Sequence, residues 1–186
     1  MDALMLMGEA TRLPDKPFLD FHCKPLFRHG WEVLSGLFDD VLVSCTPGVE
    51  DKLKAFNVPY VVDADEAGPL SGIRAGFQAL SSEYVFVAAC DIPFLNREVI
   101  ELMQGLVRLN GLVPRHPDGM LEPLHAFYHR EKTLETIQEN QALRNPRQLI
   151  GKLDMVVFDT ELLREVDPEL SSFVNVNTRE ELDVLN

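Results

Sequence analysis

Two segments of the chain combine residue types that suit a nucleotide phosphate and its metal ion. Asp91 lies two residues after the end of the apolar run Tyr84–Ala89, which is typical of a strand buried on both faces. A carboxylate at that point suits a Mg²⁺ that also takes phosphate oxygens. Gly68-Pro69-Leu70-Ser71-Gly72 opens a predicted helix, where unpaired N–H groups and glycines let the main chain approach a ligand. The alternative interpretation of Asp91 is a residue that caps the next turn. The alternative for the glycine segment is tight packing of the helix on the sheet.

Two further segments carry charges or amides beside predicted strands. The loop of residues 8–16 offers a glycine and two cations, Arg12 and Lys16, to a phosphate. It contains no Gly-Lys-Ser/Thr, so it is not a Walker A loop. Asn175 and Asn177 alternate with apolar residues, which predicts two amides on one face of a strand. An ordinary surface loop and two turn-forming asparagines are the alternatives.

Other catalytic chemistries receive little support from the sequence. His125 and His129 are four residues apart, but the chain there changes from predicted strand to predicted helix, so we expect no zinc site. Cys90 lies next to Asp91, where a small buried packing residue is favoured over a nucleophile. No Ser-His-Asp order with a nucleophile elbow is present. The chemistry expected here is therefore that of phosphate and metal.

Composition narrows the classes of partner. Of the 186 residues, 46% are hydrophobic and 25% are charged, which suits a folded domain, and we predict a single domain over residues 1–186. The net charge of −13 argues against nucleic acid and anionic membranes, because both require a positive surface field. A small phosphate ligand is compatible with this negative charge, since local N–H groups and a few cations can bind it.

The cysteines and the first residues bear on the compartment. Cys23, Cys45 and Cys90 are odd in number and widely spaced, which fits a reducing compartment without a disulfide framework. The apolar start, residues 1–7, is short, and neither a basic stretch nor a cleavage site flanks it. We therefore predict a cytoplasmic protein with neither a signal peptide nor a membrane span.

Strands and helices alternate along the chain. We expect strands over residues 3–7, 40–45, 59–62, 84–89, 112–113, 123–128, 155–158 and 173–176. We expect helices over residues 25–37, from Thr46-Pro47 to residue 56, from Pro69, over residues 96–109, and from a capping box at Thr178. This alternation predicts a mostly parallel sheet, with ligands bound beyond the carboxyl ends of its strands.

Four short motifs follow one another along the chain. They are Gly68-Pro69-Leu70-Ser71-Gly72, Cys90-Asp91-Ile92-Pro93, Glu122-Pro123-Leu124-His125-Ala126-Phe127-Tyr128 and Phe173-Val174-Asn175-Val176-Asn177-Thr178. Together they resemble the molybdenum cofactor guanylyltransferase (MobA) family of nucleotidyltransferases. The family's motifs are Gly-Pro-Leu-(Ala/Ser)-Gly, Cys-Asp-(Met/Thr)-Pro, Pro-x-x-Ala-x-Tyr and Phe-x-Asn-(Val/Ile)-Asn-Thr. The resemblance extends from Ala3 to Leu185, and four matches in order are hard to obtain by chance.

The resemblance implies a fold and an activity. The fold is a Rossmann-like α/β fold, a mostly parallel sheet with helices on both faces, similar to nucleotide-diphospho-sugar transferases. The activity is a Mg²⁺-dependent transfer of GMP from GTP to molybdopterin, with release of pyrophosphate. GTP and molybdopterin are the implied ligands and Mg²⁺ the implied cofactor. Transient contact with cofactor-synthesis or acceptor enzymes is left open.

The matching motifs also imply site residues. Lys16 and Asp91 are the implied catalytic residues: Lys16 would neutralise phosphates, and Asp91 would hold Mg²⁺. Asn175 and Asn177 would face the metal and the pterin on the acceptor side. The implied nucleotide-binding residues are Leu6, Gly8 and Asp63 around the guanine, and Arg12, Lys16, Gly68, Pro69, Leu70 and Gly72 along the rest of the nucleotide.

The first loop departs from the family's pattern. In the family it runs Leu-Ala-Gly-Gly-x-Ser-x-Arg-Met-Gly-x-Asp-Lys, whereas residues 6–16 of this chain are two residues shorter. Glu9 replaces a glycine, and a glutamate repels a triphosphate unless its side chain points elsewhere. The alternatives are therefore cytidylyl transfer to molybdopterin, guanylyl transfer to a cobinamide phosphate or phospholactate, and a non-catalytic protein that binds the nucleotide or the cofactor.

Overall fold

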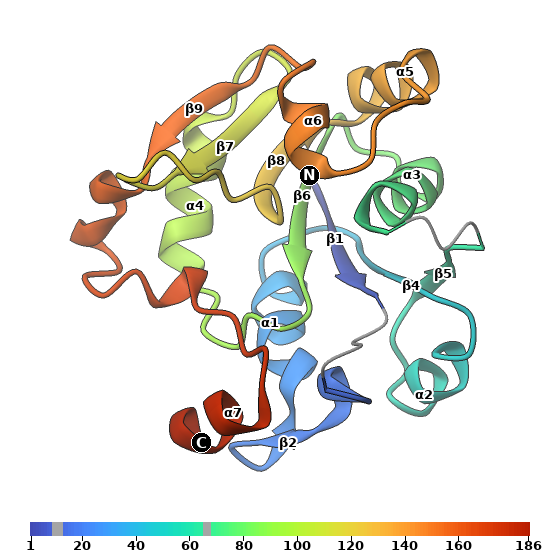
Figure 1. Cartoon of the computed structure of the whole chain (residues 1–186), viewed down its shortest axis with the longest axis vertical. Helices are drawn as coiled ribbons and strands as arrows, with labels where there is room; N and C mark the ends of the chain where they lie inside the picture. The colour runs from blue at the N-terminus through green and yellow to red at the C-terminus, as the bar shows by residue number, and fades with distance from the viewer. Residues whose placement is uncertain (9–12, 65–67) are drawn as a thin grey trace.

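Figure 1 shows the computed structural model, which describes residues 1–8, 13–64 and 68–186. The strands are β1 (Asp2–Met7), β2 (Asp20–Phe21), β3 (Lys24–Pro25), β4 (Val41–Cys45), β5 (Tyr60–Val62), β6 (Tyr84–Ala89), β7 (Gly111–Arg115), β8 (His125–His129) and β9 (Val156–Asp159). The α-helices are α1 (Leu26–Ser35), α2 (Glu50–Ala55), α3 (Pro69–Ala79), α4 (Arg97–Leu106), α5 (Arg130–Glu139), α6 (Pro146–Ile150) and α7 (Arg179–Leu185). The 3₁₀ helices are η1 (Lys16–Phe18), η2 (Thr160–Glu165) and η3 (Ser171–Phe173). No helix in the described part of the chain is long and apolar enough to cross a bilayer.

A seven-stranded sheet with the order β5-β4-β1-β6-β8-β7-β9 forms the centre of the fold. β1 pairs in parallel with both β4 and β6, and β4 pairs in parallel with β5. β8 is antiparallel to β6 and β7, and β9 is parallel to β7. Among the described strands of this sheet only β8 therefore runs against the others. The predicted mostly parallel sheet is confirmed.

Two apolar cores cover the two faces of the sheet. β1 is buried at every position, and its side chains alternate between the cores. Ala3, Met5 and Met7 join the core that contains α1 and α4, while Leu4 and Leu6 join the core that contains α3. A strand that is buried on both faces needs apolar side chains throughout, which explains the continuous apolar run at the start of the chain. The expected helices on both faces are confirmed (Figure 1).

Helix α3 approaches the sheet closely through two glycines. A Cβ at Gly76 would overlap the side chain of Leu4 on β1. A Cβ at Gly72 would lie 3.2 Å from both Leu6 Cδ2 and Ser44 Oγ. Because larger residues would push the helix outward, these glycines bring the start of α3 beside the carboxyl ends of β1 and β4.

The predicted start of α2 is wrong. α2 begins at Glu50, and Val49 precedes it with no side-chain hydrogen bond to the helix. Thr46 and Pro47 therefore do not open a helix but belong to the loop that follows β4. The turn at Gly48, with a φ of 90°, delays the helix and leaves this loop facing the carboxyl edge of the sheet.

The predicted strand over residues 173–176 is also wrong. η3 ends at Phe173, and the following segment makes one backbone bond to the site, from the Val176 N–H to the Asp91 carbonyl at 2.9 Å. A strand requires a ladder of such bonds along a partner, and alternation of residue types alone does not supply one. The capping box at Thr178, which opens α7, is confirmed.

We predict that Gly76→Ala destabilises the protein by about 1–3 kcal/mol, because the added methyl group overpacks the contact with Leu4. Urea unfolding at equilibrium measures this difference. Gly105→Ala is the matched control: Gly105 lies in α4 with open space around it, so alanine there should stabilise by about 0.5–1 kcal/mol. Equal stability of the Gly76 variant and the unmodified protein would contradict a close helix–sheet contact.

Candidate functional site

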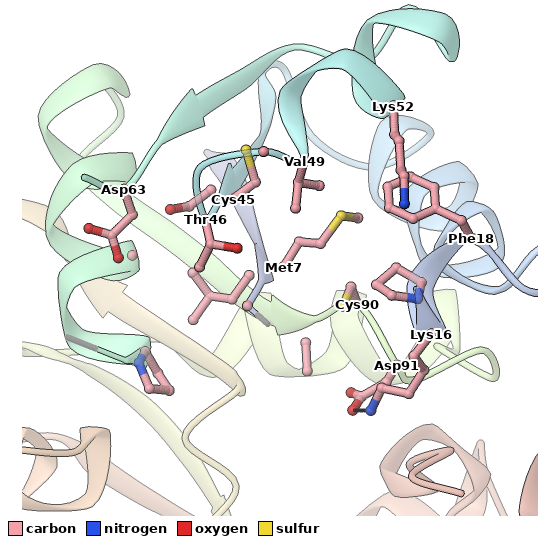
Figure 2. A pocket seen from close by; sticks show the side chains of 18 of the residues that line it. Met7, Lys16, Phe18, Cys45, Thr46, Val49, Lys52, Asp63, Cys90 and Asp91 are labelled. Atoms are coloured by element: carbon pink, nitrogen blue, oxygen red, sulfur yellow. Dashed lines mark hydrogen bonds and ion pairs between the residues drawn. The ribbon is translucent and has the colours of Figure 1, made fainter. Parts of the chain in front are cut away.

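A cavity of about 1010 Å³ opens at the carboxyl ends of β1, β4 and β6. Its described walls include residues 6–8, 14–18, 44–49 and 89–91 and the start of α3. Figure 2 shows Asp63 at one end of this space and Lys16 with Asp91 at the other. The cavity lies where ligands are expected in an open parallel sheet, and its volume suits a nucleotide-sized molecule.

Lys16 and Asp91 form an ion pair at one end of the cavity. Lys16 Nζ lies 2.5 Å from Asp91 Oδ2, and the two side chains are only 11% and 17% exposed. Lys16 opens η1 directly after Asp15, whose φ of 56° reverses the chain. Asp91 follows β6 at a point where the Cys90 N–H still donates to the Leu6 carbonyl at 3.2 Å. Backbone pairing thus fixes the carboxylate, and low exposure strengthens its attraction to the lysine.

The other carboxylate oxygen of Asp91 lacks a partner. Asp91 Oδ1 is buried, and no described donor forms a hydrogen bond with it. A buried acceptor without a donor costs about 1–3 kcal/mol, which an adjacent cation would offset. The described residues contain no group of three or more His, Cys, Asp or Glu side chains able to hold a metal. A metal at Asp91 would therefore take its other ligands from phosphate and water, as Mg²⁺ commonly does.

The opposite end of the cavity is built around Asp63. Asp63 is buried, and its N–H donates to the Cys45 carbonyl at 2.8 Å, just beyond the paired part of β4 and β5. The Ser71 hydroxyl is within hydrogen-bonding reach of Asp63 Oδ2 and also of the Gly68 carbonyl, which lies 2.7 Å away. Gly68 has a φ of 81°, a conformation that favours glycine. The turn into α3 and the orientation of the Asp63 carboxylate therefore depend on each other.

The other nucleotide-binding residues expected from the sequence fall in different places. Leu70 is buried in the core beneath α3 and does not reach the described cavity wall. Arg12 lies outside the described residues, as does Glu9. Those that line the cavity, besides Lys16, Asp63 and Gly68, are Leu6, Gly8, Pro69 and Gly72.

The two asparagines expected on the acceptor side do not share a strand face, because no strand forms there. Asn175 is half-buried, and Asn177 is exposed with its N–H donating to Glu181 Oε2 at 2.6 Å. Between them, the bond from the Val176 N–H to the Asp91 carbonyl holds this segment beside the ion pair. Neither asparagine is among the described residues of the cavity wall.

The wall also contains residues that were not predicted from the sequence, among them Phe18, Ser44 and Lys52. Ser44 Oγ is buried with no hydrogen-bond partner among the described residues. Its place near the carboxyl end of a predicted strand could have identified it. Lys52 lies on α2, pairs with the Asp15 carboxylate and lies over the Phe18 ring. No local pattern signals that contact, since it depends on how α2 packs against a distant loop.

Burial makes the cysteines and one histidine of this region unreactive. It raises the pKa of the Cys45 thiol to about 11 and that of Cys90 to about 12, so both thiols stay protonated at neutral pH. It also lowers the pKa of His125 to about 3, and the neutral ring packs against Phe86 and Phe173. These groups contribute packing, which agrees with the interpretation of Cys90 as a small buried residue.

A family model described as a MobA-like NTP transferase domain matches residues 6–156 of the chain. The chain belongs to this family. This MobA-like transferase is 41% identical to the molybdenum cofactor guanylyltransferase of Desulfosudis oleivorans, across 95% of this chain and 89% of that protein. It is 33% identical to the probable molybdenum cofactor guanylyltransferase of Methanosarcina acetivorans, across 97% of this chain and 88% of that protein.

A solved structure shares the whole fold of this MobA-like transferase. The crystal structure of molybdopterin-guanine dinucleotide biosynthesis protein A from Archaeoglobus fulgidus matches with a TM-score of 0.84 at 26% identity. The match covers 100% of this chain and 96% of that one. The resemblance inferred from four motifs is confirmed, and with it the Rossmann-like fold of a nucleotidyltransferase.

We predict that thiol reagents distinguish Cys23 from the other cysteines. Cys23 is exposed, whereas Cys45 and Cys90 are buried, so a disulfide reagent at neutral pH should modify only Cys23 in the native protein. All three thiols should react after denaturation, and peptide mass spectrometry identifies the modified sites. Rapid modification of Cys90 in the native state would contradict its assignment as a packing residue and favour a nucleophilic role.

Proposed function

We propose that this MobA-like transferase is a molybdenum cofactor guanylyltransferase, which joins GMP from GTP to molybdopterin and releases pyrophosphate. Relatives that carry this name align with nearly the whole chain. The observation that carries the proposal is the two-ended cavity, with the Asp63 carboxylate at one end and the Lys16–Asp91 pair at the other. In this proposal residues 1–186 act as one nucleotidyltransferase domain.

Asp63 is the residue proposed to recognise guanine. The Watson–Crick edge of guanine offers two adjacent donors, N1–H and the 2-amino group, and a carboxylate accepts both. Adenine and cytosine each place an acceptor beside their single amino donor, and that acceptor would face the carboxylate without a proton. Leu6, Gly8 and the start of α3 form the surrounding wall. A carboxylate at the base end therefore favours GTP over CTP and ATP.

Mg²⁺ fits the opposite end of the cavity. Asp91 Oδ1 is a buried oxygen without a described donor, and a hard divalent cation is the ligand type that such an oxygen favours. When bound, Mg²⁺ would offset the negative charge of the phosphates and of the departing pyrophosphate. Lys16, which already contacts Oδ2, would add a second positive charge on the same side.

The proposed reaction is an in-line displacement at phosphorus. An oxygen of the terminal phosphate of molybdopterin attacks the α-phosphorus of GTP, the bond from that phosphorus to the bridging oxygen breaks, and pyrophosphate leaves with the electron pair. The protein orients the two reactants and stabilises the developing charge through Lys16. No covalent enzyme intermediate is needed, which agrees with the protonated state of Cys45 and Cys90.

The acceptor is proposed to approach from the side of Asn175 and Asn177. The bond from the Val176 N–H to the Asp91 carbonyl keeps both asparagines close to the phosphate end. Their amides can donate to and accept from a pterin or its phosphate. Contact with an enzyme that supplies or receives the cofactor would be transient.

We predict that GTP binding requires Mg²⁺ and is lost in Asp91→Asn. The substitution keeps the shape of the side chain but removes the charge that would hold the cation and balance Lys16. Isothermal calorimetry with GTP, with and without Mg²⁺, measures the effect, and thermal unfolding of the variant serves as the control for folding. Mg²⁺-independent binding of GTP to a folded variant would contradict the assigned metal site. Absence of any nucleotide binding to the unmodified protein would instead favour a cofactor-binding protein without turnover.

Base selection offers a second test. Inosine triphosphate lacks the 2-amino group, so the unmodified protein should bind GTP at least about tenfold more tightly than inosine triphosphate, the ratio expected for one hydrogen bond to a charged group. Asp63→Asn should remove most of that preference, because the amide cannot accept two hydrogen bonds at the same edge. A preference for CTP in the unmodified protein would move the proposal to cytidylyl transfer.

A further inference from the structure

Lys52 is a cation in the cavity wall to which the transferase reaction assigns no role. It lies on α2, and its side chain is 45% exposed. Figure 2 shows it extending from α2 toward Phe18, on the same side of the cavity as Lys16 and Asp91. Its neighbour Lys54 pairs instead with Asp51 on the same helix and does not line the cavity.

An incoming anion can replace the ion pair that Lys52 forms in this structure. Its ammonium group pairs with the Asp15 carboxylate, which is 66% exposed. An exposed ion pair of this kind contributes little stability. The ammonium also lies 5.4 Å from the centre of the Phe18 ring, which stacks on Phe56 and meets the edge of Phe27. The ring is thus held firmly by its neighbours, while the ion pair above it is loose.

The charges of the cavity wall indicate that Lys52 is available to an anionic ligand. Among the described wall residues, Lys16 and Lys52 face the three carboxylates of Asp15, Asp63 and Asp91. Lys16 is already engaged with Asp91 at 2.5 Å. A nucleoside triphosphate that enters this space adds further negative charge, and Lys52 is the described wall cation that is exposed enough to meet it.

We propose that Lys52 is a second phosphate-binding residue, which leaves Asp15 when a nucleotide enters and binds the β- and γ-phosphates. The inference rests on the proposed use of this cavity as the nucleotide site. The Phe18 ring supports the lysine stem and limits the positions of its ammonium group. Asp15 serves as the resting partner and competes with the phosphates for the same cation.

A structural explanation makes a different prediction. If the Lys52–Asp15 pair only ties α2 to the loop that carries Lys16, then loss of either partner should weaken phosphate binding equally. If Lys52 binds phosphate, loss of the lysine should weaken binding, while loss of Asp15 should strengthen it. Lys52→Met keeps the packing against Phe18 without the charge, and Asp15→Asn removes the competing anion.

The experiment compares Lys52→Met, Asp15→Asn and the control Lys54→Met by calorimetry with Mg²⁺ present. The ligands are GTP, GMP and inorganic triphosphate. Lys52→Met should lower the affinity for GTP and for inorganic triphosphate about tenfold, the low end for a hydrogen bond to a charged group, and leave GMP unchanged. Asp15→Asn should raise the affinity for both triphosphates, and Lys54→Met should change nothing.

The outcomes separate this inference from the proposed function. Parallel weakening in Lys52→Met and Asp15→Asn, or an equal effect of Lys52→Met on GMP and GTP, would overturn the role of Lys52 in phosphate binding. A Lys52 effect on inorganic triphosphate in a protein that prefers another base would uphold that role and overturn only the choice of guanine. Thermal unfolding of each variant confirms that the compared proteins are folded.

Discussion

The site depends on the parallel pairing of β1 with its neighbours. Parallel strands end at the same edge of a sheet, and in this chain the ladders continue one step past the strands. The Asp63 N–H donates to the Cys45 carbonyl, and the Cys90 N–H donates to the Leu6 carbonyl. These bonds fix two of the carboxylates in the cavity wall, Asp63 and Asp91, on opposite sides of the end of β1. Rigid backbone pairing thus sets the span that a nucleotide must bridge.

The Lys16–Asp91 pair shows that this edge is not arranged for stability alone. Removing two charges from water costs free energy that their mutual attraction regains only when their hydrogen bonds are completed. Here one carboxylate oxygen stays without a described donor. A hydrophobic pair of similar volume would fold at least as well, so the stability of the fold does not explain the pair. A cation and a phosphate would complete it, which is the argument that joins the fold to nucleotidyl transfer.

The features that could be predicted from the sequence are those with a local signature. The buried run before Asp91, the glycine and proline that open α3, and the position of Lys16 after the first strand are all visible in the residue order. The strand expected at residues 173–176 failed because a strand needs a partner, which no local pattern reveals. Lys52 was missed for a related reason: its place in the cavity follows from the packing of α2 against the Phe18 ring.

Electrostatics also constrains the order in which ligands can assemble. The chain carries a net charge of −13, and within it the described cavity wall holds three carboxylates and two lysines. Such a surface repels a free triphosphate more strongly than one that carries a divalent cation, because the cation cancels part of the phosphate charge. In the sequence, residues 6–16 are two residues shorter than the first loop of the family, and Glu9 replaces a glycine there. Side chains on separate elements, Lys16 in η1 and Lys52 on α2, supply the positive charge on one side of the cavity. Lys52 reaches that side through its pairing with Asp15 and its place over the Phe18 ring.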